Sequence, residues 1–191
     1  SLNEKKFLHE TFLLLQVCDP DSINYDPGMK IFHLGSTYNL NVFLAGTDNS
    51  PYQDKWNLKV NFPDEYPVRA PEIKFISVPY HLNVSKEDQI CLYEICDGYS
   101  PSISILTILK KIKKLLSFPS HENAIDIQIL TIYNNDRAEY KKLARESTDM
   151  NAKDDYMEYI SNAKIIDDKK LFFTVQFKRG NTSWIIWENS I

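Results

Sequence analysis

One short segment, residues 55–62, constrains the fold more than any other part of the chain, because polar and apolar residues alternate in it without interruption. The apolar positions are Trp56, Leu58, Val60 and Phe62, and a lysine or an asparagine precedes each of them. A period of two places the apolar side chains on one face of a β-strand and the polar ones on the other. The segment therefore predicts a strand of an antiparallel sheet with one buried and one solvated face.

Three further segments complete a predicted four-stranded antiparallel meander. Residues 38–44 alternate in the same way, Ile73 and Phe75 flank Lys74, and a weaker strand is expected over residues 30–34. Helical spacing of apolar residues predicts helices over residues 2–16, 105–116, 126–133 and 136–148. The order of one helix, then strands, then helices indicates an α+β fold.

The expected helices have distinct apolar faces. In the first, Leu8, Phe12 and Leu15 share a face, and Pro20 prevents its continuation. The second would be capped by Ser102 or Ser104. Its apolar stripe consists of Ile105, Ile108, Leu109, Ile112 and Leu116. The lysines between residues 110 and 114 lie mostly off this stripe and are expected on a solvated face.

The last forty residues differ from the rest and suggest a domain over residues 1–149 with an extension over residues 150–191. A short helix is expected over residues 154–163. Two β-prone runs, residues 171–177 and 183–187, surround the turn-like sequence KRGNT and predict a β-hairpin. Both runs are apolar on both faces, so we expect the hairpin to be covered by its own domain or by a partner.

Composition excludes several classes of function. A net charge of -4 gives no electrostatic reason to bind nucleic acid or an anionic membrane, and no apolar run approaches the length of a membrane span. Three cysteines, Cys18, Cys91 and Cys96, make neither a disulfide framework nor a zinc motif, so no metal and no bound cofactor are expected. They favour a reducing compartment, cytoplasmic or nuclear, with organelle targeting left open.

The residues that point to chemistry lie in a long stretch without periodicity, residues 77–101. It contains His81, Asn83 and Cys91. A cysteine thiolate can attack a carbonyl and hold the acyl group as a thioester, and an asparagine N–H could stabilise the oxyanion when an amine attacks. His81 is the nearby candidate for a base. Cys91, between Ile90 and Leu92, could equally be a buried core residue, so these residues permit acyl transfer without establishing it.

Several motifs occur in a fixed order that resembles the ubiquitin-conjugating enzyme family, from about Asn3 to Thr148. The motifs are Ser50-Pro51-Tyr52, Phe62-Pro63 with Glu65-Tyr66-Pro67 and Ala70-Pro71, His81-Leu82-Asn83, Ile90-Cys91-Leu92, Tyr99-Ser100-Pro101, and Asn135-Asp136-Arg137 with Tyr140 and Ala144-Arg145-Glu146. Cys91 comes ten positions after His81, which is the spacing of the family. Each motif alone is weakly specific, whereas the collinear set is specific.

The resemblance implies a cytoplasmic or nuclear transferase with this family's α+β fold. Its Cys91 would accept ubiquitin or a ubiquitin-like modifier from an activating enzyme, which consumes the ATP, and would pass it to a substrate lysine with a RING- or HECT-type ligase. Asn83 would support the loop and the oxyanion, and Asn123 would help to place the lysine. The ligase would contact Phe62, Pro101 and Ser102, and the activating enzyme would contact Lys5 and Lys6. The alternative is a catalytically silent binding module of the same fold that assists another conjugating enzyme.

Each implied contact has a structural alternative. Phe62 could belong to the core, Lys5 and Lys6 could be solvated helix charges, and Pro101 could simply start a helix. The sequence also departs from the family: Leu82 replaces a proline, Tyr99 a tryptophan and Asn123 an acidic residue, and residues 84–89 lack the glycine often found there. Asparagine cannot act as a base, so lysine activation would depend on desolvation or on Glu122. The leucine at position 82 should free a backbone N–H.

Overall fold

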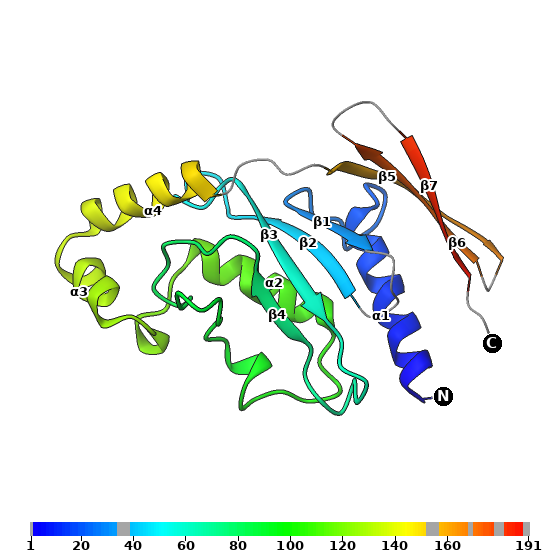
Figure 1. Ribbon diagram of the computed structural model, residues 1–191, viewed down its shortest axis with the longest axis horizontal. Coiled ribbons are helices and arrows are strands. Elements are labelled where there is room, and N and C mark those ends of the chain that lie inside the picture. Colours follow the sequence, from blue (N-terminus) through cyan, green and yellow to red (C-terminus); the bar gives the residue numbers. More distant parts are fainter. Residues whose placement is uncertain (1, 34–38, 152–156, 168–169, 178–181, 189–191) are drawn as a thin grey trace.

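The computed structural model describes the backbone of residues 2–33, 39–151, 157–167, 170–177 and 182–188 (Figure 1). Side chains are described for residue 6 and for residues 9–31 and 39–151. In this part of the chain one helix precedes a four-stranded sheet, and further helices follow it. The predicted α+β architecture is therefore confirmed. No helix among the described residues is long and apolar enough to cross a membrane.

Helix α1 (Leu2–Cys18) ends before Pro20, as predicted, but it buries a different face. Glu10, Leu14 and Val17 are buried, whereas Phe12 is 47% exposed. These buried positions are four and three residues apart, which places them on one side of a helix. Several sides of α1 carry apolar residues, and packing against β1 and α2 selects among them. The side chain of Leu8 lies outside the described residues.

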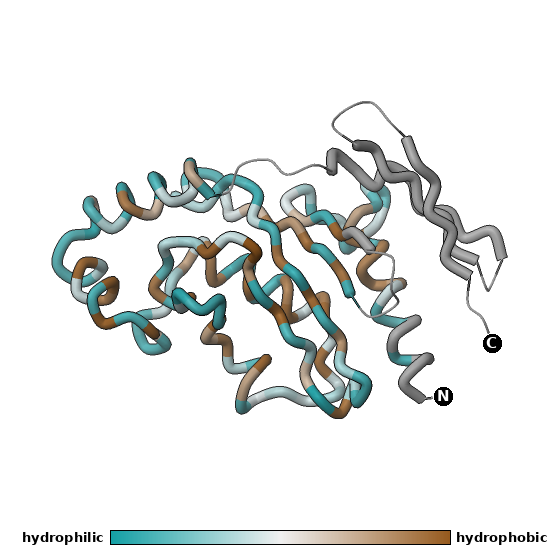
Figure 2. Tube along the Cα trace, viewed as in Figure 1, coloured by the Kyte–Doolittle hydropathy of each residue, from teal (hydrophilic) through white to brown (hydrophobic). Residues whose placement is uncertain are grey.

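The sheet is an antiparallel meander in the strand order β1-β2-β3-β4. Its strands are β1 (Met29–His33), β2 (Asn39–Ala45), β3 (Lys55–Asn61) and β4 (Glu72–Phe75). Leu58 of β3 lies opposite Val42 of β2 and Phe75 of β4, and all three side chains are buried. Figure 2 shows the alternation of hydrophilic and hydrophobic positions along the central strands. The four strands confirm the predicted meander, except that Tyr38 lies outside the described residues.

Helix α2 (Ile105–Ser117) packs the predicted apolar stripe into the main core. Ser104 is its N-cap, and its hydroxyl accepts a 3.1 Å hydrogen bond from the backbone N–H of Thr107. The lysines on α2 are only in part a solvated face, because Lys111 forms an ion pair with Glu94 and Lys113 forms one with Asp26. These pairs fasten the segments after Cys91 and after α1 onto the same helix.

Helices α3 (Ile127–Asn135) and α4 (Arg137–Asn151) lie at the end of the domain away from α1 (Figure 1). They bury a second, smaller apolar cluster, which consists of Leu82, Ile129, Tyr133 and Tyr140. We refer to these four residues as the second cluster. Because Leu82 comes from the irregular loop, this cluster is where the helices meet the candidate site.

The C-terminal segment forms a separate three-stranded antiparallel sheet in the order β5-β6-β7. Its strands are β5 (Met157–Asp167), β6 (Lys170–Phe177) and β7 (Thr182–Glu188). The helix expected over residues 154–163 is wrong, because residues 157–163 lie in β5. That segment pairs with β6 along its length, and it carries β-prone Tyr159 and Ile160 beside Ser161 and Asn162, which are poor helix formers.

The predicted hairpin corresponds to β6 and β7, which pair with Leu171 opposite Trp187. Residues 178–181, which form most of the expected turn, lie outside the described residues. The side chains of this sheet also lie outside them. The hairpin as a whole, its covering and the domain boundary at residue 150 therefore stay predictions.

Gly46, at the end of β2, gives a first testable prediction. A Cβ atom at this position would lie 2.6 Å from the carbonyl oxygen and 2.9 Å from the carbonyl carbon of Tyr52, both backbone atoms. The Gly46 N–H donates to the same oxygen at 2.8 Å, so moving the two segments apart would also break this hydrogen bond. Gly46→Ala is expected to lower the free energy of unfolding by about 2 kcal/mol, measured by urea denaturation.

Gly98→Ala is the matched control. There the close atoms belong to the ring of Tyr93, which is 66% exposed and free to turn aside. Gly98→Ala should lower the free energy of unfolding clearly less than Gly46→Ala does. Equal losses for the two variants would contradict the explanation.

Candidate active site

The site is built where the two ends of one loop meet. The backbone N–H of Cys91 donates to the carbonyl of Asn83 at 2.9 Å, and Val84 and Ile90 form an isolated antiparallel bridge. Cys91 is a free, half-buried cysteine in this arrangement. The bridge therefore places the candidate nucleophile beside Asn83.

A tight turn closes this loop. The hydroxyl of Ser85 accepts hydrogen bonds from the backbone N–H groups of Glu87 and Gln89 at 3.1 and 3.2 Å. Asp88 has a φ of 66°, in the left-handed region that glycine adopts most easily. This explains how a loop without the usual glycine still turns: aspartate is one of the few other residues that tolerate the conformation.

This turn predicts that glycine is more stable than alanine at position 88, and that the order is reversed at the neighbouring position 87. Asp88→Gly should be about 1 kcal/mol more stable than Asp88→Ala, because alanine bears the left-handed strain that glycine avoids. Glu87 has no positive φ, so Glu87→Gly should be less stable than Glu87→Ala. Thermal unfolding of the four variants measures both differences. The same order at the two positions would contradict the prediction.

His81 is not available as a base. Its ring is fully buried, its Nδ1 accepts the backbone N–H of Asn83 at 3.0 Å, and its Nε2 lies 3.0 Å from the carbonyl of Leu115. These partners assign the proton to Nε2, which donates to Leu115. Burial lowers the pKa of His81 to about 4, so the ring is neutral near pH 7. His81 thus connects the loop to α2 and supplies no general base.

The Cys91 thiol is not activated within the resting site. Burial raises its pKa, and the nearby Cys96 raises it further. A cysteine protease instead needs an imidazole that withdraws the thiol proton. The buried His81 therefore cannot activate water against a thioester either. Among the described residues no three histidine, cysteine or acidic side chains converge on a metal site.

The side chain of Asn83 holds the segment opposite Cys91. Its Nδ2 donates to the carbonyls of Ser120 and Asn123 at 2.6 and 2.7 Å, and its Oδ1 accepts the N–H of Ser120 at 2.9 Å. The side chain is fully buried. The geometry agrees with the loop-supporting role expected for Asn83. Both N–H donors of Asn83 are engaged in these bonds, and the oxyanion role stays a prediction.

Asn123 lies in a short 3-10 turn, η2 (His121–Asn123), which Asn83 holds through backbone atoms. The side chains of Asn123 and Glu122 are exposed, so an incoming amine can reach both of them. The structure therefore brings Cys91, Asn83 and the backbone of Asn123 into one site.

Comparison with known proteins agrees with this geometry. The family model described as "Ubiquitin-conjugating enzyme" matches residues 19–148. A relative from Drosophila melanogaster, "Ubiquitin-conjugating enzyme E2 N", is 30% identical over 154 residues, which cover 79% of this chain and 97% of the relative.

The chain belongs to the ubiquitin-conjugating enzyme family.

It is therefore a transferase of the ubiquitin-like conjugation pathway, with the fold predicted for it from sequence. Members of this family work with ubiquitin, an activating enzyme and a ligase. The remaining predicted site residues concern the two enzyme partners.

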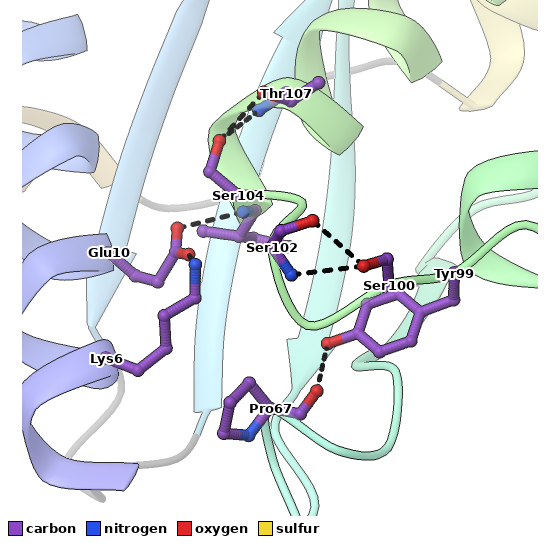
Figure 3. Close-up of polar contacts among 9 residues, drawn as sticks. Lys6, Glu10, Pro67, Tyr99, Ser100, Ser102, Ser104 and Thr107 are labelled. Atoms are coloured by element: carbon purple, nitrogen blue, oxygen red, sulfur yellow. Dashed lines mark hydrogen bonds and ion pairs between the residues drawn. The ribbon is translucent and has the colours of Figure 1, made fainter. Parts of the chain in front are cut away.

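Phe62 was predicted to contact a ligase, but its side chain is buried. It is only 5% exposed and packs against the ring of Tyr66, with the ring centroids 4.8 Å apart, so it belongs to the core of this conjugating enzyme. Pro101 and Ser102 are exposed. They lie in the turn before α2, where Ser102 contacts the hydroxyl of Ser100 (Figure 3). Pro101 precedes the N-cap, so it does not start the helix.

Val68, which was not among the predicted site residues, is 77% exposed. It follows Pro67, whose carbonyl accepts a 2.8 Å hydrogen bond from the hydroxyl of Tyr99 (Figure 3). This bond joins the loop of Val68 to the turn of Pro101, so the tyrosine that replaces tryptophan unites the two loops. No sequence signal separated an exposed valine here from a core valine.

Lys6 connects to the same region through a buried carboxylate. It forms a 2.8 Å ion pair with Glu10, which is 1% exposed. The other oxygen of Glu10 accepts the backbone N–H of Ile105 at 2.9 Å, at the start of α2 (Figure 3). Lys6 is thus part of an internal contact between α1 and α2 rather than a free surface charge. The side chain of Lys5 lies outside the described residues.

Proposed function

We propose that Cys91 carries ubiquitin, or a ubiquitin-like modifier, as a thioester and passes it to a lysine amine. The observation that carries the proposal is the half-buried Cys91 fixed to Asn83 in a loop whose histidine is buried, neutral and bonded on both nitrogens. Such a site can hold an acyl group, and its histidine cannot activate water to hydrolyse it.

Charging exchanges one thioester for another. The Cys91 thiol loses its proton, attacks the carbonyl carbon of the modifier's C-terminal residue, and displaces the thiol of the activating enzyme. Because the pKa of the Cys91 thiol is raised, we expect the docked activating enzyme to help remove the proton, which the departing thiolate of that enzyme can take up. We expect α1, with Lys6 and Lys5, to take part in docking that enzyme. No bound cofactor is needed in this chain, since ATP is consumed upstream.

In transfer, a lysine amine attacks the thioester carbon and expels the Cys91 thiolate. The new carbon–nitrogen bond is an isopeptide bond between the modifier and the lysine. The exposed Asn123 and Glu122 lie on the segment that Asn83 holds, and they are the proposed contacts of the lysine. Asn123 can orient the amine but cannot deprotonate it, so Glu122 is the nearest candidate to receive the proton. Positioning of the two reactants supplies the remaining acceleration.

A RING- or HECT-type ligase is proposed to contact Pro101, Ser102 and Val68. Pro101 and Ser102 are exposed together on one turn, and the bond from Tyr99 to Pro67 joins that turn to the loop of Val68. An exposed apolar valine beside a proline suits the small apolar contacts that such interfaces use. The proposed site of action is a reducing compartment, cytoplasmic or nuclear, where Cys91 stays free.

A charging assay tests the proposal. The full chain is mixed with an activating enzyme, ATP and labelled ubiquitin, and the products are separated with and without reductant, beside Cys91→Ala and Cys96→Ala. A reductant-sensitive band that Cys91→Ala loses and Cys96→Ala keeps would support Cys91 as the carrier. A band that appears only with another modifier would assign the enzyme to that modifier's pathway.

Absence of a band with every modifier would overturn the proposal and favour the silent binding module. The presence of a free cysteine at position 91 is the specific observation against that alternative.

A further inference from the structure

Leu82 is the departure from the family pattern that the structure explains best. It stands between His81 and Asn83, where the resembled motif has proline. Its side chain is fully buried, and it belongs to the second cluster with Ile129, Tyr133 and Tyr140. A proline ring is shorter than leucine and would fill less of this cluster. Residue 82 therefore joins the site loop to both α3 and α4 through side-chain packing.

The backbone of Leu82 reinforces the same connection. Its carbonyl accepts the backbone N–H of Ile125 at 3.0 Å. The adjacent Asn83 holds Ser120 and the carbonyl of Asn123. Residues 82 and 83 together thus anchor both halves of the segment 120–125, and we call this segment the gate strip. Asn83 also accepts the N–H of Cys91, so the gate strip and Cys91 are fixed to the same short piece of chain.

The tyrosine hydroxyls of the second cluster extend the connection to the sheet side. Tyr140 lies 2.8 Å from the hydroxyl of Tyr52, which donates to the carbonyl of Tyr80 at 2.7 Å.

We propose that Leu82 is a positioning residue for transfer: by seating α3 and α4 on the site loop, it sets the place of the gate strip relative to Cys91. This inference rests on the proposed function for its catalytic consequence, and on the contacts alone for its structural one. Charging depends on Cys91 and the docked activating enzyme, whereas transfer also needs Asn123 and Glu122 in place. Loosening Leu82 should therefore slow transfer more than charging.

The test compares two fully buried leucines. Leu82→Ala truncates the second cluster, and Leu109→Ala truncates α2 in the main core, so the chemical change is the same. Leu82→Met is the conservative variant, and Leu82→Val replaces Leu82→Ala if the alanine variant does not fold. Each variant is charged with ubiquitin, freed of ATP, and mixed with lysine at a temperature where circular dichroism shows it fully folded.

Leu82→Ala is expected to discharge to lysine about tenfold more slowly per charged molecule, with charging within twofold of the natural chain. Leu109→Ala should leave the ratio of the two rates unchanged, and Leu82→Met should restore it. Unchanged discharge in Leu82→Ala, or an equal loss in Leu109→Ala, would overturn the inference.

Hydrogen exchange separates this result from the proposed function, because it needs no activity. The amides of Ser120 and Ile125 should exchange at least tenfold faster in Leu82→Ala than in Leu109→Ala, since their acceptors are Asn83 and Leu82. Faster exchange without charging of the natural chain would overturn the proposed function and keep the structural role of Leu82. Charging of the natural chain with unchanged exchange in Leu82→Ala would support the proposed function and overturn the structural role of Leu82.

Discussion

Replacing Asn83 with alanine should lower both stability and transfer, and we expect it to be the most damaging single change outside Cys91. The variant loses three part-buried hydrogen bonds at once, to the backbone groups of Ser120 and Asn123. Each such bond contributes about 1 kcal/mol, so the free energy of unfolding should fall by roughly 3 kcal/mol. Discharge of the thioester to lysine should fall on the order of 100-fold, because a small misplacement of reacting groups can cost this much.

Two further variants sharpen this prediction. Asn83→Asp has the same shape but places a carboxylate against two carbonyl oxygens, so it should be at least as unstable as the alanine variant. Asn135→Ala, an exposed asparagine at the end of α3, should leave both properties unchanged. Urea denaturation and single-turnover discharge measure the two effects. If Asn83→Ala lost transfer while keeping its full stability, Asn83 would act on the oxyanion and not on the loop.

Acidification should destabilise the protein through His81. Burial lowers the pKa of this histidine from 6.5 to about 4, so between these pH values the unfolded chain takes up a proton that the folded chain refuses. Stability is therefore greatest above pH 6.5, falls as the pH drops toward 4, and changes little through this residue below that. The full loss corresponds to about 3 kcal/mol.

Urea denaturation at intervals from pH 7.5 to 4 measures this effect. His81→Gln should be less stable than the natural chain at pH 7.5, and the difference should shrink as the pH falls. His121→Gln, which replaces an exposed histidine on η2, is the matched control for the chemical change. A difference for His81→Gln that stays constant with pH would contradict the assignment.

Local patterns predicted most of the fold correctly because their physical causes are local. The alternation around Leu58 is enough to specify a half-buried strand, and Ser104 before an apolar stripe is enough to specify a capped helix. The helical spacing of α1 did not settle which face is buried. That choice depends on Glu10, whose carboxylate is stable in the interior because it meets Lys6 and the start of α2. β5 was missed although it carries β-prone residues, because its pairing partner β6 lies outside the local pattern.

For the site, the sequence indicated a chemistry and left the geometry open. The spacing of His81, Asn83 and Cys91 indicated thioester chemistry through a family resemblance, and the comparisons confirm the family. The partners of these side chains could not be read from the sequence. The carbonyl of Leu115 and the backbone of Ser120 approach the loop only in the folded chain. Phe62 and Val68 are both apolar residues near the same motif, so the sequence does not distinguish them. In the folded chain Phe62 packs against Tyr66, whereas Val68 faces solvent.

The contacts that close this domain also determine when it can fold during synthesis. Glu10 contacts a residue 95 positions later, Tyr52 one 88 positions later, and Asp54 one 91 positions later. Closing loops of this length costs conformational entropy before the contacts repay it, and such topologies fold slowly. A nascent chain therefore cannot complete these contacts until Arg145 has left the ribosome. We expect the domain to close late in synthesis, and not progressively as its N-terminus emerges.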